Sequence, residues 1–166
     1  MPDDSAPSSL QKQLEEFFTP ELATALSKPG ALHVPLRHVR PEFILALVRD
    51  DDPMTAREQL GILIDLALAE TAAIDIFPPL AIITWGGNFD ADAPRPTLEA
   101  KRQSLVTKIA ASMGQNVAMV HGSGEAVAGF VGGDRLMHYG SLFAGFSAIL
   151  KVLTETPFGE IQEWRT

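Results

Sequence analysis

The stretch that decides the fold runs from residue 116 to residue 156: NVAMVHGSGEAVAGFVGGDRLMHYGSLFAGFSAILKVLTET. Residues 117–121 form a short apolar segment that is typical of a strand, and Gly122-Ser123-Gly124 supplies a turn. Residues 126–131 have the composition of a return strand, which Gly132-Gly133-Asp134 ends. The sequence therefore predicts a β-hairpin over this segment.

The second half of this stretch predicts a buried helix over residues 141–154. The segment is nearly all apolar, and Lys151 is its only charged residue. A helix that is apolar on most of its surface needs a covering layer. We therefore interpret the upstream chain as the sheet and helices against which this helix packs.

The composition predicts one globular domain. The chain has 166 residues, of which 46% are hydrophobic and 20% charged, so it can bury a single core. The formal net charge of -8 argues against nucleic acid and anionic membrane surfaces as partners. The absence of cysteine excludes disulfides, thiolate metal sites and a cysteine nucleophile. No signal peptide and no uncharged run of about 18 residues is found, so a cytoplasmic location is expected.

The N-terminal part is expected to lie outside the main domain. Residues 1–8 predict a disordered tail. Residues 9–40 predict a helical extension and linker, in which apolar side chains recur at helical spacing. This extension would pack on its own domain or on a second copy. The remaining residues, 41–166, form the predicted domain.

The upstream pattern predicts an α+β fold. Residues 43–48 are continuously apolar and predict a central strand, although a helix that begins at Pro41-Glu42 is the alternative. Asp50-Asp51-Asp52-Pro53 predicts a helix cap, with a solvated cap favoured over a cation site. The further predicted elements are a helix over 54–73, strands over 74–77 and 80–85 joined at Pro78-Pro79, a helix over 97–113 and a short strand after 159. This order is typical of a ferredoxin-like sheet with helices packed mainly on one face.

The chain resembles the class III nucleotidyl (adenylate/guanylate) cyclase domain at residues 124–132, Gly-Glu-Ala-Val-Ala-Gly-Phe-Val-Gly. That family shows His-Thr-Gly-Glu-Val-Val-Ala-Gly-Asn-Val-Gly after a strand, and the present glycines fall at matching positions. His138-Tyr139 stands where the family has Asp-Tyr, and the upstream order matches from Phe43 onward. The resemblance implies the cyclase-homology form of the α+β sheet.

The resemblance also implies a degenerate site. Family members hold two Mg²⁺ ions with two aspartates, and Val48 and Pro79 stand at those positions. Four further family positions also differ. Asp75 and Gly140 stand at the positions that select the base. Ser147 and Lys151 stand at the positions that orient the ribose and stabilise charge on the phosphates. Lysine does not reproduce the planar fork of the family's arginine. The last hairpin of complete cyclase domains is also expected to be missing here.

We therefore expect a catalytically inactive domain, without cofactor or metal, that regulates or scaffolds through dimerisation or partner binding. The resemblance implies head-to-tail pairing as a homodimer or with a related domain. The expected partner surface comprises His121, Phe130, Tyr139, Phe143 and Phe146. One alternative is a nucleotide sensor or atypical cyclase that holds metal with Asp50, Asp51 or Asp52. The other is an unrelated acidic protein-interaction module.

Other signals favour structural roles. The Gly122-Ser123-Gly124 segment lacks the dinucleotide-binding spacing, because Val127 occupies the third glycine position. Ser123 lacks a nucleophile elbow. The four histidines, His33, His38, His121 and His138, show no tight metal-ligand spacing, although His121 and His138 could approach across the predicted hairpin. Lys151 is interpreted as a lysine at the core edge whose amine reaches solvent, with an anion contact as the alternative.

Overall fold

The computed structural model describes residues 37–87, 90–133 and 136–165, together with Lys12, Ala23, Thr24 and Ser27. For residues 130–140 the description is limited to the backbone. The predicted disordered tail (1–8) and most of the predicted helical extension and linker (9–40) lie outside the described residues. Within the described residues, no helix is both long and apolar enough to cross a membrane.

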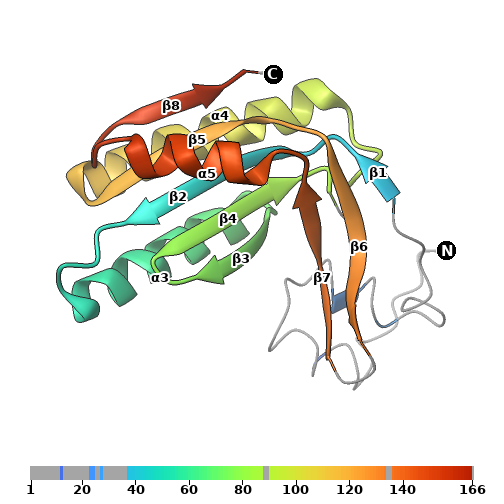
Figure 1. Ribbon diagram of the computed structural model, residues 1–166, viewed down its shortest axis with the longest axis horizontal. Coiled ribbons are helices and arrows are strands. Elements are labelled where there is room, and N and C mark those ends of the chain that lie inside the picture. The colour runs from blue at the N-terminus through green and yellow to red at the C-terminus, as the bar shows by residue number, and fades with distance from the viewer. Residues whose placement is uncertain are drawn as a thin grey trace, which may run out of the picture.

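A five-stranded sheet forms the centre of the molecule, in the order β3-β4-β2-β5-β8 (Figure 1). Its strands are β2 (Glu42–Val48), β3 (Ala73–Phe77), β4 (Leu80–Trp85), β5 (Val117–Ser123) and β8 (Ile161–Trp164). The middle strand, β2, pairs antiparallel with β4 and β5, and β8 lies parallel to β5. The predicted central strand and the predicted strand after residue 159 are thus confirmed, and the alternative helix at Pro41-Glu42 is wrong.

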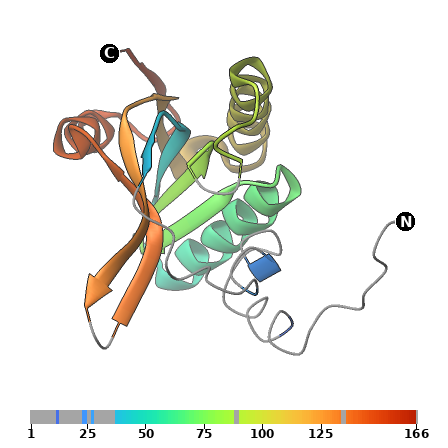
Figure 2. The ribbon, with the colours of Figure 1, turned by 90° about the vertical axis from the view of Figure 1, so that its right-hand side faces the viewer.

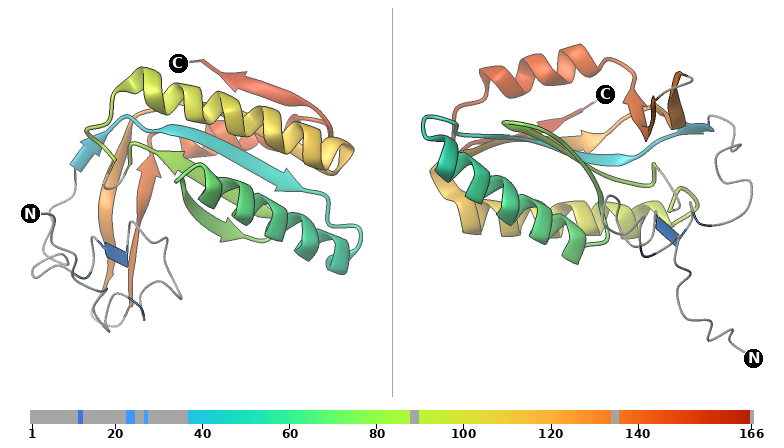
Figure 3. Two further views of the ribbon diagram at one scale, coloured as in Figure 1. Left: turned by 180° about the vertical axis from the view of Figure 1, so that it is seen from behind. Right: turned by 90° about the horizontal axis from the view of Figure 1, so that it is seen from below.

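Helices cover both faces of this sheet (Figure 3). They are α3 (Pro53–Ala69) and α4 (Arg95–Met113) on one face and α5 (Phe146–Glu155) on the other. Side chains of β2 alternate accordingly: Ile44 and Ala46 belong to the core under α3 and α4, whereas Phe43 and Leu45 belong to the core under α5. The α+β class is confirmed, with two helices on one face and one on the other.

The predicted cap of α3 is confirmed. The Asp52 side chain accepts hydrogen bonds from the backbone amides of Met54 at 3.3 Å and Thr55 at 3.1 Å. Pro53 occupies the first turn, where a missing amide proton costs nothing. The helix ends at Ala69, earlier than the predicted residue 73, and the chain turns at Thr71, which has a positive φ of 56°.

A second, three-stranded sheet projects from the body in the order β1-β6-β7 (Figures 1 and 2). Its strands are β1 (Arg37–Val39), β6 (Ala126–Gly133) and β7 (Leu136–Phe143). The β1–β6 ladder continues the register of the β2–β5 ladder, and the Gly124 amide donates to the Pro41 carbonyl at 3.2 Å between them. β1 and β2 therefore form one long bent strand that runs through both sheets, and β5 and β6 form the other. β1 lies before residue 41, the predicted start of the domain.

The predicted hairpin between residues 117–121 and 126–131 is wrong. β5 pairs with β2 and β8, whereas β6 pairs with β1 and β7. Gly122 is a strand residue, and a Cβ there would lie 2.7 Å from the Trp164 carbonyl oxygen, so glycine allows β8 to approach. The predicted helix over 141–154 begins only at Phe146, because residues 141–143 complete β7.

Candidate functional site

The two positions that the resemblance assigns to metal aspartates are neighbours in the fold. The Val48 amide donates to the Pro79 carbonyl at 3.0 Å, which extends the β2–β4 ladder by one pair. The Val48 side chain is fully buried in the core under α3 and α4, and Pro79 lies in the β3–β4 turn. Neither side chain carries an oxygen that could bind a cation.

The three aspartates that follow β2 make different contacts. Asp52 caps α3, and its hydrogen bonds with Thr55, then with Met54, lower its pKa. Asp51 forms an exposed ion pair with Arg49 at 3.4 Å. Asp50 lines a cavity together with Pro78 and Pro79. Within the described residues, no three His, Cys, Asp or Glu side chains are grouped so that they could hold a metal ion.

The remaining degenerate positions are spread over three elements. Asp75 lies on the edge strand β3 opposite Ile82, and Gly140 lies on β7 opposite Gly129. Ser147 and Lys151 lie one turn apart on the exposed side of α5. The predicted exposure of the Lys151 amine is confirmed, because the side chain is 75% exposed and lies 3.8 Å from Glu155.

α5 is less buried than predicted. Only Ile149 and Leu153 are buried in it, and its polar residues face solvent. α5 lies over β2, β5 and β8, and none of the described helices covers the β3–β4 half of the same sheet face (Figure 3).

An apolar row occupies that uncovered half. Phe77 of β3 is opposite Leu80 of β4, and Leu80 is opposite Leu47 of β2. Phe77 is 56% exposed, and Leu47, Leu80 and the neighbouring Ile82 are only partly buried. We call Leu47, Phe77, Leu80 and Ile82 the open sheet patch. It crosses three strands on the α5 side of the sheet.

The predicted partner surface is only partly available. His121 and Phe143 are buried within the chain itself, with 7% and 8% exposure, so both are wrong as surface residues. Phe143 packs edge-on against Phe43 with ring centroids 5.2 Å apart. Phe146 is half-buried against the α5 core. The side chains of Phe130 and Tyr139 lie outside the described residues.

A buried polar cluster, not anticipated from the sequence, lies under α4. Arg102 donates from Nε to Glu42 Oε2 at 2.7 Å, and its Nη1 contacts Nδ1 of His121. All three side chains are buried. Arg95 adds a half-exposed contact from Nη2 to Glu42 Oε1 at 3.1 Å. The cluster ties α4 to β2 and β5.

The electrostatics of this cluster favour a neutral histidine. Burial lowers the pKa of His121, the adjacent Arg102 charge lowers it further, and Glu163 opposes both. Nδ1 of a neutral imidazole can accept from the guanidinium, whereas a protonated ring cannot. Among the described residues, the hydrogen bonds and ion pairs of this cluster join Glu42, Arg95, Glu99, Arg102 and His121 to one another.

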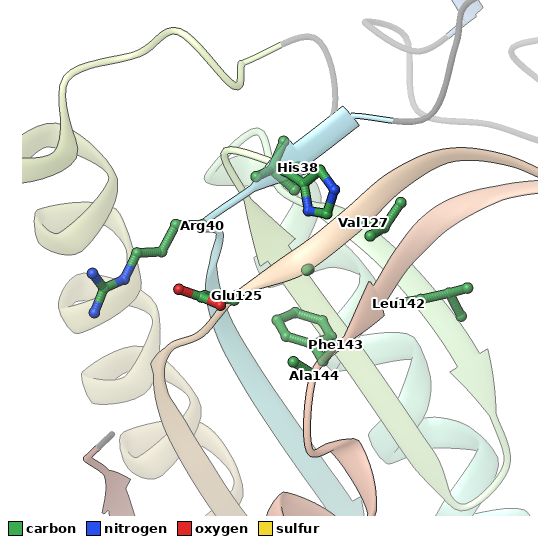
Figure 4. A pocket seen from close by; sticks show the side chains of 9 residues that line it. His38, Arg40, Glu125, Val127, Leu142, Phe143 and Ala144 are labelled. Atoms are coloured by element: carbon green, nitrogen blue, oxygen red, sulfur yellow. The ribbon is translucent and has the colours of Figure 1, made fainter.

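The described surface includes two cavities that adjoin the residues discussed above. One, of about 580 Å³, lies where β1, β6 and β7 meet, and Phe143 and Val127 contribute apolar walls (Figure 4). His38 and Glu125 also line this cavity, whereas the Arg40 side chain points away from it toward the neighbouring helix (Figure 4). The other, of about 630 Å³, lies between α3 and the β3–β4 hairpin.

Comparisons with known proteins identify the fold. The chain has the α+β fold of class III adenylyl and guanylyl cyclase catalytic domains, as the sequence resemblance predicted. A scan against family models found no matching model, and a search of curated proteins found no matching sequence.

Three solved structures illustrate the likeness. The guanylate cyclase domain of RhGC from Catenaria anguillulae in complex with GTP aligns with a TM-score of 0.62 and 10% identity, over 76% of this chain and 79% of that one. The dimeric guanylyl cyclase domain of the RhoGC fusion protein from Blastocladiella emersonii gives 0.60 and 10%, over 78% and 81%. The adenylyl cyclase CyaB from P. aeruginosa gives 0.53 and 16%, over 77% and 78%.

Proposed function

We propose that this chain is a catalytically inactive domain of cyclase fold that acts by associating with a protein partner, foremost a second copy of itself. The observation that carries the proposal is the adjacency of Val48 and Pro79. The resemblance requires carboxylates at these two positions, and the fold brings the positions together without any.

The charge balance supports the loss of turnover. Phosphoryl chemistry on a nucleoside triphosphate depends on divalent ions that neutralise the phosphates. Here the protein has a net charge of -8, and the nearby Asp51 and Asp52 are engaged by Arg49 and by the α3 amides. A triphosphate would therefore meet an acidic surface with no divalent ion held at these positions.

The open sheet patch supports association. Contiguous exposed apolar side chains on a small domain mark interaction surfaces more often than chance exposure does. The patch lies on a sheet face that α5 covers only in part, so a partner could complete the second layer. The RhoGC domain, which has a similar fold, is a non-canonical dimer, and this makes a second copy the first partner to test.

The catalytic half of the proposal is tested by incubating the protein with ATP or GTP and Mg²⁺ or Mn²⁺, with an active cyclase such as CyaB as the positive control. We expect no cyclic nucleotide and no heat on calorimetric titration. Turnover would overturn the proposal. Heat without turnover would favour the alternative of a nucleotide sensor.

The association half is tested by light scattering at micromolar concentration. We expect the mass of a dimer for the native chain and of a monomer for Phe77→Ser. Met54→Ser is the matched control, because Met54 is also exposed, at 61%, but lies on α3. A monomeric native chain would rule out self-association. Equal masses for the native chain and Phe77→Ser would remove the open sheet patch from the interface.

A further inference from the structure

The cavity between α3 and the β3–β4 hairpin is a second candidate site, separate from the open sheet patch. Its walls include Ala56, Leu60 and Ile64 of α3, with Ile76 of β3 opposite them. Ile76 packs with the α3–α4 core, so this cavity lies on the other side of the sheet from the open sheet patch. Its volume of about 630 Å³ is typical of small-molecule sites.

A glycine in the middle of α3 enlarges this cavity. Gly61 lines it, and a Cβ built at this position would meet no atom within 4 Å. Glycine is the least favourable residue in a helix interior after proline. Neither close packing nor a positive φ requires it here. The structural effect of Gly61 is therefore to leave open space where other residues would place a side chain.

Two opposite charges lie near one end of the cavity. Asp50 precedes α3 and Arg57 lies in its second turn, whereas Gly61 and Ile64 lie one to two turns further along. Within the described part of the chain, neither Asp50 nor Arg57 makes an ion pair or a side-chain hydrogen bond, so they are not paired with each other. A ligand with an apolar body and a head group of both charges would satisfy this arrangement.

We propose that this cavity binds a free apolar α-amino acid of the leucine or phenylalanine type. Its ammonium group contacts Asp50, its carboxylate contacts Arg57, and its side chain occupies the space beside Gly61 and Ile76. A simple carboxylate would be repelled by Asp50, and a simple amine by Arg57. The zwitterion is thus the small head group that matches both charges.

Calorimetric titration of the full chain with L-leucine and L-phenylalanine tests the proposal. Two analogues isolate the charges: 4-methylpentanoate lacks the ammonium group, and 3-methylbutylamine lacks the carboxylate. We expect the amino acids to bind about three- to fivefold more tightly than either analogue, since each analogue loses one ion pair with an exposed side chain. No heat with either amino acid at millimolar concentration would overturn the proposal, as would equal affinity for the singly charged analogues.

Variants locate the site. Gly61→Leu fills the cavity and is expected to abolish binding without unfolding the protein, because the added side chain enters open space. Ala111→Leu, on the exposed side of α4, is the matched control and should bind normally. Asp50→Asn and Arg57→Gln should each weaken binding by about three- to fivefold, because both side chains are exposed. Native affinity in Gly61→Leu would show that any binding occurs elsewhere and would overturn the assignment.

Discussion

Replacement of Arg102 by methionine tests whether the buried polar cluster holds α4 on the sheet. The Glu42 and Arg102 side chains are 4% and 5% exposed, and their hydrogen bond is 2.7 Å long. Removing one partner of a buried pair costs about 3–5 kcal/mol, because the other charge remains buried. Arg95 still contacts Glu42 at 3.1 Å, which places the expected loss near 3 kcal/mol, the lower end of that range.

A double-mutant cycle separates the pair from the loss of either group. We expect Glu42→Leu to cost about as much as Arg102→Met, since it leaves a buried guanidinium. The double variant should be more stable than the sum of both losses predicts, by about 2 kcal/mol or more, because an apolar pair replaces the ion pair. His121 loses its guanidinium contact in the double variant, so full recovery is not expected.

Urea unfolding followed by tryptophan fluorescence measures these free energies, since Trp85 is fully buried and reports on the core. Lys151→Met is the control: its contact with Glu155 is exposed on both sides, and its loss should cost less than about 0.5 kcal/mol. A cost below about 1 kcal/mol for Arg102→Met, or additive single variants, would refute the assigned role of the cluster.

Three further outcomes follow from individual positions. Gly61→Ala should raise the free energy of unfolding by about 0.5–1 kcal/mol in the same urea assay, because alanine is a better helix former and its Cβ meets no atom. Burial holds the pKa of His121 below its usual 6.5, so the unfolded chain takes up the proton first and stability should fall as pH drops below about 6.5. His121→Gln should flatten that slope in thermal melts, whereas the exposed His38→Gln should not. Gly122→Ala forces its Cβ to 2.7 Å from the Trp164 carbonyl, so β8 amides should lose hydrogen-exchange protection while β2 keeps its own.

Local signals predicted much of the element order. Asp52 caps α3 and Pro53 occupies its first turn. The Pro78-Pro79 pair marks the turn between β3 and β4. Both depend on residues close in sequence, where side-chain hydrogen bonding and missing amides act directly on the backbone. Such effects can be inferred without knowing the tertiary fold.

Strand partnership could not be inferred in the same way. Gly122-Ser123-Gly124 has the composition of a turn, yet β5 continues straight through Gly122 because Trp164, far along the chain, needs close approach there. β7 was missed because its glycines and polar residues precede an apolar run at helical spacing. At Gly122 a distant strand overrides the local composition, whereas β7 forms a local hairpin with β6 that the composition did not indicate.

The buried polar cluster is indicated less clearly by the sequence. Glu42 begins an otherwise apolar strand, and Arg102 falls on the stripe that carries Leu98 and Leu105 into the core. A charged residue on the buried face of a strand and another on the buried face of a helix suggest an ion pair. The separation of Glu42 and Arg102 in the sequence does not show how close they lie in the fold. The adjacency of Val48 and Pro79 likewise required the sheet register, although the identity of each residue was evident beforehand.

The shared register of the two sheets has a practical consequence for fragment design. A shortened chain that begins at residue 41 would retain the five-stranded core but lose β1, and the backbone of β6 from Ala126 to Ala128 would have no neighbour on that side. An uncovered strand edge is a template for pairing with other chains. Fragments intended for crystallisation or binding assays should therefore begin before Arg37, so that aggregation through β6 is not mistaken for a native assembly.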